Sequence, residues 1–258
     1  MDAVAIEGAQ VRINGRTILG PVDLHVGEHE RWVLLGPNGS GKTTLLKLAG
    51  ARRQPSAGLV TIFGHRLGRT DIRALHPRIG HVSHALADQL RPSIPVLDVV
   101  LTGRDAALEP WMRKFDAQDR ALAASLLSQV GCANLSERTL GTCSMGERQR
   151  MLLARAMFGR HDLLLFDEPA AGLDLPARER LLIAMGSGSS AGPASMLATH
   201  HLEEIPLTTT HAALLRAGLI VTQGAIEDVL RPGALSECFG LQIEVERRDG
   251  RWSARAAG

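Results

Sequence analysis

The fold of this chain is decided by one stretch, Gly36-Pro37-Asn38-Gly39-Ser40-Gly41-Lys42-Thr43-Thr44. It reads G-x-x-x-x-G-K-T, a pattern typical of loops that surround phosphate groups. An apolar run at 31–35 precedes it, and a helical run at 44–49 follows it and stops at Gly50. The order strand, glycine loop, helix favours a nucleotide-binding loop over an ordinary glycine-rich turn with a chance lysine.

The residue types in this loop suit phosphate chemistry. Glycines let the backbone curl until successive N–H groups point at a phosphate, and the helix that follows adds its positive end. Lys42 supplies a mobile cation for the outer phosphates, and Thr43 supplies a hydroxyl for Mg²⁺. We therefore predict that residues 36–44 bind the phosphates of a nucleotide.

Composition narrows the class of protein. The chain has 258 residues, 45% hydrophobic residues and a net charge of +2, which fits one large domain, or one domain with an appendage, and implies no strongly charged partner. Its arginines are scattered, so they do not indicate a nucleic-acid-binding stripe. The three cysteines lack metal-ligand spacing and favour a reduced, cytosolic setting.

The sequence also predicts how the chain meets a membrane. We find neither the apolar stretch of a signal peptide nor an apolar run of about 20 residues that could cross a bilayer. Any membrane role is therefore expected to come through a partner.

The first part of the chain is predicted to be rich in β-structure. Asn14-Gly15 indicates a hairpin turn between the apolar segments 11–13 and 17–19. Asp249-Gly250 indicates another hairpin near the end of the chain. Further strands are predicted at 22–26, 59–63, 162–167, 195–199, 214–215 and 219–221.

The middle of the chain, about 71–160, is predicted to be mostly helical. Apolar residues at helical spacing mark 96–101 and 120–130, and Asp116 and Asp119 are candidate caps for the second helix. The segment 186–193, rich in glycine and serine, is predicted to be a surface loop.

Two adjacent acids follow the apolar run at 162–166. Asp167 could hold Mg²⁺, and Glu168 could orient and deprotonate an attacking water. The alternative is a capped strand end with two solvated acids.

The segment 143–150 opens a helical run and has two interpretations. Ser144 and Glu147 form an S-x-x-E capping box, which is a structural feature. A helix N-terminus that carries Ser144 and Gly146 is also suited to an anion.

Together these motifs resemble the ATP-binding cassette family, the nucleotide-binding subunits of ABC transporters, over about residues 4–230. The segment around Ser144 is similar to the family's L-S-G-G-Q signature, although Cys143, Met145 and Glu147 depart from it. The resemblance implies an α/β P-loop NTPase (RecA-like) core at about 1–75 and 160–230, with an antiparallel β subdomain and an inserted helical subdomain at about 76–159. A tail, 231–258, is expected to form a β-hairpin outside the cassette.

The resemblance also assigns roles to single residues. Asp167 matches the magnesium carboxylate, Glu168 the catalytic base and His200 the switch histidine that senses the γ-phosphate. The segment 171–174 resembles the D-loop, which touches the partner cassette. ATP and Mg²⁺ are the implied cofactors.

Two positions depart from the family pattern. His84 stands where the family has a glutamine that contacts Mg²⁺ and the water and communicates with the membrane subunits. A histidine could perform part of this role at the metal site, and it would be sensitive to pH. Ile13 stands near the position where an aromatic residue stacks on adenine, so stacking is expected to be weaker.

The implied function is ATP hydrolysis that powers transport. Two cassettes, expected to be copies of this chain, would pack head to tail, with ATP between Lys42 of one and Ser144 of the other. Separate membrane permease subunits, and possibly a substrate-binding protein, would complete the system at the inner, cytoplasmic face of the membrane. The short chain without fused spans favours uptake.

Two other functions are compatible with parts of the same sequence. One alternative is an ABC-type ATPase that acts on nucleic acid or ribosomes, but the chain lacks the coiled coils or second cassette of such relatives. A P-loop small-molecule kinase is disfavoured by the Ser144 segment and by the acid pair. His81 and His84 are three residues apart, but no nearby acid or cysteine completes a structural metal site.

Overall fold

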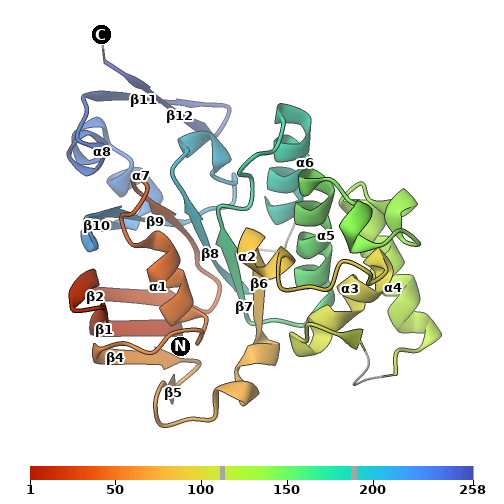
Figure 1. Cartoon of the computed structure of the whole chain (residues 1–258). Coiled ribbons are helices and arrows are strands. Elements are labelled where there is room, and N and C mark those ends of the chain that lie inside the picture. Colours follow the sequence, from red (N-terminus) through yellow and green to blue (C-terminus); the bar gives the residue numbers. More distant parts are fainter. Residues whose placement is uncertain (111–113, 187–190, 258) are drawn as a thin grey trace. The chain divides into compact units, whose positions relative to one another are not determined.

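The structure is a computed structural model that describes residues 1–110, 114–186 and 191–257. Two compact units make up the chain (Figure 1). Unit 1 consists of Met1–Ile72 with Ser190–Gly258, and unit 2 consists of Arg73–Ser189. The helical lobe predicted at about 76–159 lies in unit 2, which continues beyond it through one more strand and helix.

The first sheet of unit 1 is antiparallel, with strand order β2-β1-β4-β5. Its strands are β1 (Asp2–Ile13), β2 (Arg16–Gly27), β4 (Ala57–Ile62) and β5 (His65–Arg66). Asn14 and Gly15 both have positive φ (49° and 80°), as a two-residue hairpin turn requires. The predicted hairpin between β1 and β2 is therefore confirmed.

A second set of strands in unit 1 lies in the order β10-β9-β3-β8. Its members are β3 (Arg31–Leu35), β8 (Ala194–Thr199), β9 (His211–Arg216) and β10 (Leu219–Ala225). β3 runs parallel to β8 and to β9, while β10 is antiparallel to β9. β3 is apolar and buried from Trp32 to Leu35, as expected of a strand covered on both faces.

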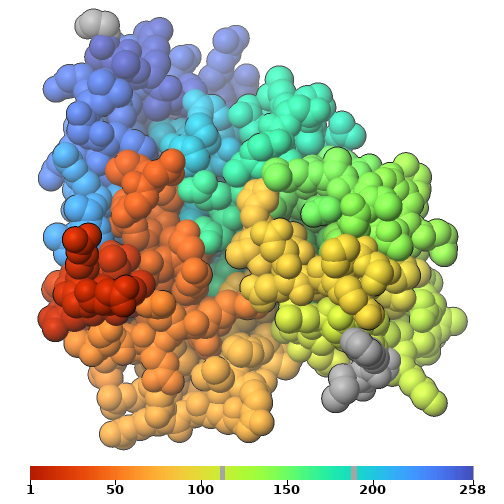
Figure 2. All heavy atoms as spheres, in the orientation of Figure 1, coloured from red at the N-terminus to blue at the C-terminus, as the bar shows by residue number. Residues whose placement is uncertain are grey.

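Helices and a tail complete unit 1. The helices are α1 (Lys42–Ala49), the 3₁₀ turn η7 (Leu202–Glu204), α7 (Ile226–Val229) and α8 (Pro232–Phe239). The tail hairpin predicted around Asp249-Gly250 is confirmed as β11 (Ile243–Arg248) and β12 (Arg251–Ala256). It packs on α8 and η7, and Figure 2 shows its dark-blue atoms against the lighter blue atoms that precede it.

Unit 2 contains a parallel strand pair and several helices. β6 (Ile79–Ser83) pairs with β7 (Leu163–Asp167), and the register places Ser83 beside Asp167. The α-helices are α2 (His84–Ala87), α3 (Val96–Leu101), α4 (Ala117–Gln129), α5 (Met145–Phe158) and α6 (Leu175–Gly186). The 3₁₀ turns are η1 (Ile72–Ala74), which straddles the unit boundary, η2 (His76–Arg78), η3 (Thr102–Asp105), η5 (Ala133–Leu135) and η6 (Leu140–Thr142).

The helical predictions for unit 2 are confirmed at α3 and α4. Asp116 and Asp119 form a reciprocal capping box at the start of α4. α5 packs against α3, α4 and β6, and its central residues are buried. In the loop predicted at 186–193, residues 187–190 lie outside the described residues. No helix in the described ranges has both the length and the apolar character to cross a bilayer.

Candidate nucleotide-binding site

The phosphate loop of unit 1 joins β3 to α1, as the sequence predicts. Gly36 and Gly41 have φ values of 154° and 105°, in the region that favours glycine. A Cβ added at Gly36 would lie 2.0 Å from the carbonyl oxygen of Leu215, and one at Gly41 would lie 2.9 Å from Leu19. The loop therefore needs glycine at these positions, because the chain packs directly against them.

Backbone hydrogen bonds connect the loop to the turn at Gly218 and to α1. The Gly218 N–H donates to the Ser40 carbonyl at 3.0 Å, and the Leu45 N–H donates to the Gly41 carbonyl at 2.9 Å. The first N–H groups of α1 have no partner within the helix, as at any helix start, and no acidic residue lies in its first turn. This helix end is therefore suited to an anion.

Lys42 lies inside the loop. Its Nζ donates to the carbonyl oxygens of Gly36 at 2.8 Å and Pro37 at 3.1 Å, and the residue is only 4% exposed. Thr43, one residue further, is exposed, while Thr44 is half-buried. The ammonium group is thus centred among loop backbone groups, and the threonine hydroxyl that would hold Mg²⁺ lies at the surface.

Ser40 gives independent support for a ligand at the loop. Its side-chain oxygen is buried, and it has no hydrogen-bond partner among the described residues. An orphaned buried hydroxyl is uncommon in a folded protein and calls for an explanation. A phosphate oxygen in the loop would supply the missing partner.

Unit 1 brings His200 to the same end of the strands as the loop. β3 and β8 are parallel, and their register pairs Leu35 with Thr199, so Gly36 and His200 follow directly from neighbouring strand ends. Functional residues of parallel sheets gather at this end. The imidazole of His200 also contacts that of His201, with ring centroids 4.0 Å apart and the ring planes tilted by 41°.

Ile13 lies at the end of β1, next to the hairpin turn. Its side chain is 39% exposed, and across the turn it pairs with Arg16. It can offer an apolar surface to a base but no aromatic ring. Leu19, further along the same hairpin, is the residue that packs on Gly41.

In unit 2, the two acids follow β7 as predicted. Asp167 ends the strand, and Glu168 has a φ of 45°, which is rare for a residue with a Cβ. Such strained positions often occur at functional sites. The sequence does not reveal this strain, because no turn residue marks it.

His84 lies close to these acids within unit 2. It follows Ser83, which is in register with Asp167, and it begins α2, which Ser83 caps by accepting the Leu86 N–H at 3.2 Å. The His84 Nε2 atom is buried and has no hydrogen-bond partner in the described part of the chain. The imidazole therefore has an unused polar atom beside the strand ends that carry the acids.

The segment with Ser144 begins α5, and the predicted capping box is confirmed. The Ser144 N–H donates to Glu147 at 2.7 Å, and the Glu147 N–H donates to the Ser144 hydroxyl at 3.3 Å. The backbone N–H of Ser144 is the main reason that the pKa of Glu147 is lowered. A Cβ added at Gly146 would touch Leu173 at 3.4 Å, so the segments predicted as signature and D-loop are neighbours in unit 2.

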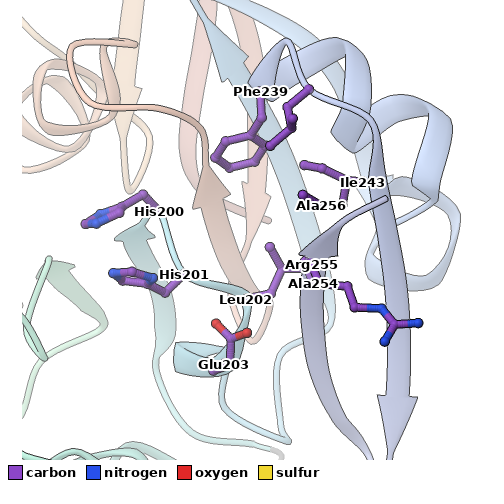
Figure 3. A pocket seen from close by; sticks show the side chains of 10 residues that line it. His200, His201, Leu202, Glu203, Phe239, Ile243, Ala254, Arg255 and Ala256 are labelled. Carbon is purple, nitrogen blue, oxygen red and sulfur yellow. The ribbon is translucent and has the colours of Figure 1, made fainter. Parts of the chain in front are cut away.

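A cavity of about 260 Å³ lies beside His200 in unit 1 (Figure 3). The imidazoles of His200 and His201 lie on one side, and Ile243 and Ala254 of the tail lie on the other. No sequence pattern predicts that the tail lies beside His200. More than 40 residues separate the two segments, and no motif links them.

No group of three histidine, cysteine or acidic side chains that could bind a metal ion occurs among the residues that the structure describes. The three cysteines, Cys132, Cys143 and Cys238, are free and buried. Burial raises the pKa of the Cys238 thiol to about 11.

Comparisons with known proteins show the family to which the chain belongs. The family model described as ABC transporter matches residues 19–171, more than half of the chain. YlmA of Bacillus subtilis (strain 168), an uncharacterized ABC transporter ATP-binding protein, is 35% identical over 243 residues, which cover 93% of this chain and 92% of YlmA. The hemin import ATP-binding protein HmuV of Streptomyces coelicolor is 33% identical over 248 residues, with coverage of 93% and 84%.

A solved structure supports the same fold. The dimeric structure of an ATP-binding cassette in a post-hydrolysis state, bound to ADP and Pi, gives a TM-score of 0.75 at 21% identity and covers 86% of this chain and 98% of that chain. The fold is therefore that of an ABC ATPase cassette, a P-loop NTPase. The chain belongs to the ABC transporter family, as an ATP-binding subunit that hydrolyses ATP to drive transport.

Proposed function

We propose that two copies of this chain power uptake through separate membrane permease subunits, to which they bind at the inner face of the membrane. The observation that carries the assignment is the phosphate loop of unit 1, with its enclosed Lys42 and orphaned Ser40 hydroxyl. The similarity to a hemin import ATP-binding protein supports uptake as the direction. A substrate-binding protein outside the membrane is the partner that an importer of this kind would use.

ATP with Mg²⁺ is the proposed ligand of the loop. Residues 36–44 and Lys42 suit the phosphates, and Ile13 would contact adenine. The Thr43 hydroxyl and the Asp167 carboxylate are hard oxygen donors of the kind that Mg²⁺ prefers. The metal would neutralise charge on the phosphates. Because imidazole nitrogen is a poorer ligand for Mg²⁺, we propose that His84 acts on water rather than on the metal directly.

The catalytic roles follow from the chemistry of each side chain. Glu168 would orient a water molecule and accept its proton as the oxygen attacks the γ-phosphate. Lys42 and His200 would donate hydrogen bonds to phosphate oxygens. These bonds would stabilise the negative charge on those oxygens in the transition state of γ-phosphate transfer to water. None of these roles requires a covalent intermediate with the protein.

The start of α5 is proposed to face the ATP of a second copy. Ser144 would present its hydroxyl and Gly146 its backbone N–H to phosphate, because the Ser144 N–H already donates to Glu147. Met145, between them, is 55% exposed, and Leu175 at the start of α6 is 61% exposed. Exposed apolar side chains next to a polar anion site are suited to a protein interface.

The test separates hydrolysis from binding. Glu168→Gln removes the base but keeps the size of the side chain, so ATP turnover should fall by about 100-fold or more. ATP affinity, measured by equilibrium binding, should stay close to that of the unmodified chain. The matched variant Lys42→Ala should instead lose affinity. Turnover near the original rate in Glu168→Gln would show that Glu168 is not the base.

The transport assignment has its own test. Tagged Glu168→Gln protein should co-purify with integral membrane proteins from membranes solubilised in mild detergent. Recovery of the chain only with ribosomes or nucleic acid would contradict a transport role, even if the ATPase results hold.

A further inference from the structure

The turn that follows β8 contains a buried hydrogen-bonded clamp around His200. Thr199 is 0% exposed and Glu204 is 5% exposed. The hydroxyl of Thr199 is bonded to the Glu204 carboxylate, and it accepts the N–H of His201 at 3.2 Å. The N–H of Glu204 in turn donates to the His201 carbonyl at 3.3 Å.

The direction of these hydrogen bonds is fixed by chemistry. A backbone N–H can only donate, so the Thr199 oxygen accepts from His201 and its own proton goes to Glu204. A buried carboxylate is costly unless its oxygens are satisfied. Glu204 and Thr199 therefore depend on each other, and the backbone of His200 and His201 is enclosed between them.

Apolar side chains and the tail surround the clamp. Leu202 and Ile205, on either side of Glu204, are 4% and 2% exposed. The tail strand β12 packs on the same 3₁₀ turn η7 from outside. An exposed polar bond would exchange with water, but this one is shielded on both sides.

We propose that Glu204 is a positioning residue for hydrolysis, which acts through Thr199 to fix the backbone that presents His200 to the γ-phosphate. The inference rests on the proposed role of His200. Both side chains are buried, so we expect neither Glu204 nor Thr199 to touch the nucleotide. Their effect is on the orientation of the imidazole, and misplacement of a catalytic group by about 1 Å can cost about 100-fold in rate.

The variants are chosen to break or keep the clamp. Thr199→Val removes the hydroxyl at constant size, and Glu204→Leu removes the acceptor. Thr199→Ser and Glu204→Gln each keep a group that can complete the bond. The neighbouring acid supplies the matched control Glu203→Leu, because Glu203 is half-exposed and does not take part in the clamp.

The expected result is a selective loss of turnover. Thr199→Val and Glu204→Leu should lower kcat about tenfold or more, because each removes one hydrogen bond that positions His200. ATP affinity should change less than about twofold. Thr199→Ser, Glu204→Gln and Glu203→Leu should keep kcat within about threefold of the original. Thermal melting curves identify variants that do not fold. If Glu204→Leu is one of them, the isosteric Thr199→Val decides.

A second background tests whether the clamp acts through His200. In His200→Ala protein, whose residual turnover is measured with radiolabelled ATP, Thr199→Val should cause no further loss, because the group that it positions is absent. An equal loss in both backgrounds would mean a general structural role and would overturn the proposal. So would unchanged kcat in both Thr199→Val and Glu204→Leu.

The outcomes also separate this inference from the proposed function. If His200→Ala alone keeps normal turnover, the role of His200 is wrong and the clamp inference falls with it. If His200→Ala is impaired but the clamp variants are not, only the inference about Glu204 is wrong.

Discussion

Gly36 shows how a single residue limits the nucleotide loop. Its φ is 154°, and a Cβ added here would lie 2.0 Å from the carbonyl oxygen of Leu215. The site therefore has no room for a side chain. The obstacle is backbone, which cannot rotate away as a flexible side chain can. The same glycine supplies the carbonyl that Lys42 binds, so any shift at this position also moves the lysine's acceptor.

Gly36→Ala should therefore reduce both stability and ATP binding. We expect a loss of about 3 kcal/mol in the free energy of unfolding, typical of severe overpacking, together with a clear loss of ATP affinity. Urea denaturation and equilibrium binding measure the two effects.

Gly64→Ala is the matched control for this prediction. Gly64 has a φ of 77° and nothing within 4 Å of an added Cβ. The control should cost only about 1 kcal/mol, from the left-handed backbone alone, and should leave ATP affinity unchanged. Equal losses in the two variants would show that crowding at Leu215 does not matter.

At the scale of elements, two helices begin with the same reciprocal cap. Asp116 with Asp119 caps α4, and Ser144 with Glu147 caps α5. Only the second is proposed to touch ATP. Comparing the two caps therefore distinguishes the contribution of a cap to stability from a role of Ser144 in ATP turnover.

Ser144→Ala and Asp116→Ala should each lower the free energy of unfolding by about 1 kcal/mol. Only Ser144→Ala should also lower ATP turnover. Denaturation curves and steady-state ATPase assays on both variants test this. A similar loss of turnover in Asp116→Ala would mean that the effect at α5 comes from stability alone.

The start of β7 carries a pH-sensitive packing contact. His161 is 8% exposed, and its Nδ1 lies 2.9 Å from the Pro77 carbonyl, so the ring donates there. Burial is the main cause that lowers the pKa of His161. Below about pH 6.5 the unfolded chain therefore takes up a proton on this residue that the folded chain resists.

The stability of the protein should fall as the pH drops from about 6.5 toward the lowered pKa of His161, with a contribution of at most about 1.4 kcal/mol per pH unit. His161→Asn keeps a donor for Pro77 but does not titrate, so this part of the slope should disappear. Urea denaturation at several pH values measures it. An unchanged slope in His161→Asn would contradict the assignment.

Much of this element structure could be predicted from local sequence. The hairpin at Asn14-Gly15, the strand that ends at Asp167 and the caps of α4 and α5 each have a short-range signal that the structure confirms. α8 was not predicted. Its eight residues contain a proline and a glycine, and its burial of Leu235 and Cys238 depends on packing against β9 and β11.

The candidate site also contains some residues that could be predicted from local sequence and some features that could not. The loop 36–44 and the strand-end residues Asp167 and His200 follow motifs, so their identity could be predicted. The strain at Glu168, the orphaned Ser40 hydroxyl and the Thr199–Glu204 clamp could not. Each depends on which atoms are buried together, and this is set by contacts between elements rather than by residue spacing.

At the scale of the whole molecule, the proposal requires two chains for each complete site. Each copy would offer Lys42 to its own ATP and Ser144 to the ATP of its partner. The arrangement can be tested by complementation between a chain that lacks Lys42 and a chain that lacks Ser144. In their heterodimer, one site would lack both residues and the other site would have both.

Lys42→Ala protein and Ser144→Ala protein should each fail to form dimers with ATP when alone. An equal mixture should form heterodimers, because one of their two sites then contains an intact Lys42 and an intact Ser144. Both chains also carry Glu168→Gln so that ATP persists, and light scattering after size exclusion measures the mass. No dimer in the mixture would contradict head-to-tail packing, provided that Glu168→Gln alone dimerises.

The contacts of Lys42 with Gly36 and Pro37 affect what a measured ATP affinity represents. In the proposed role of Lys42, nucleotide binding at this nitrogen would be an exchange of ligands, in which carbonyl oxygens leave as phosphate oxygens arrive. The measured affinity then reports a difference between two sets of oxygens rather than the strength of one. Release of product would run the exchange backwards, with the loop's own carbonyls competing for the cation and helping the phosphate to depart.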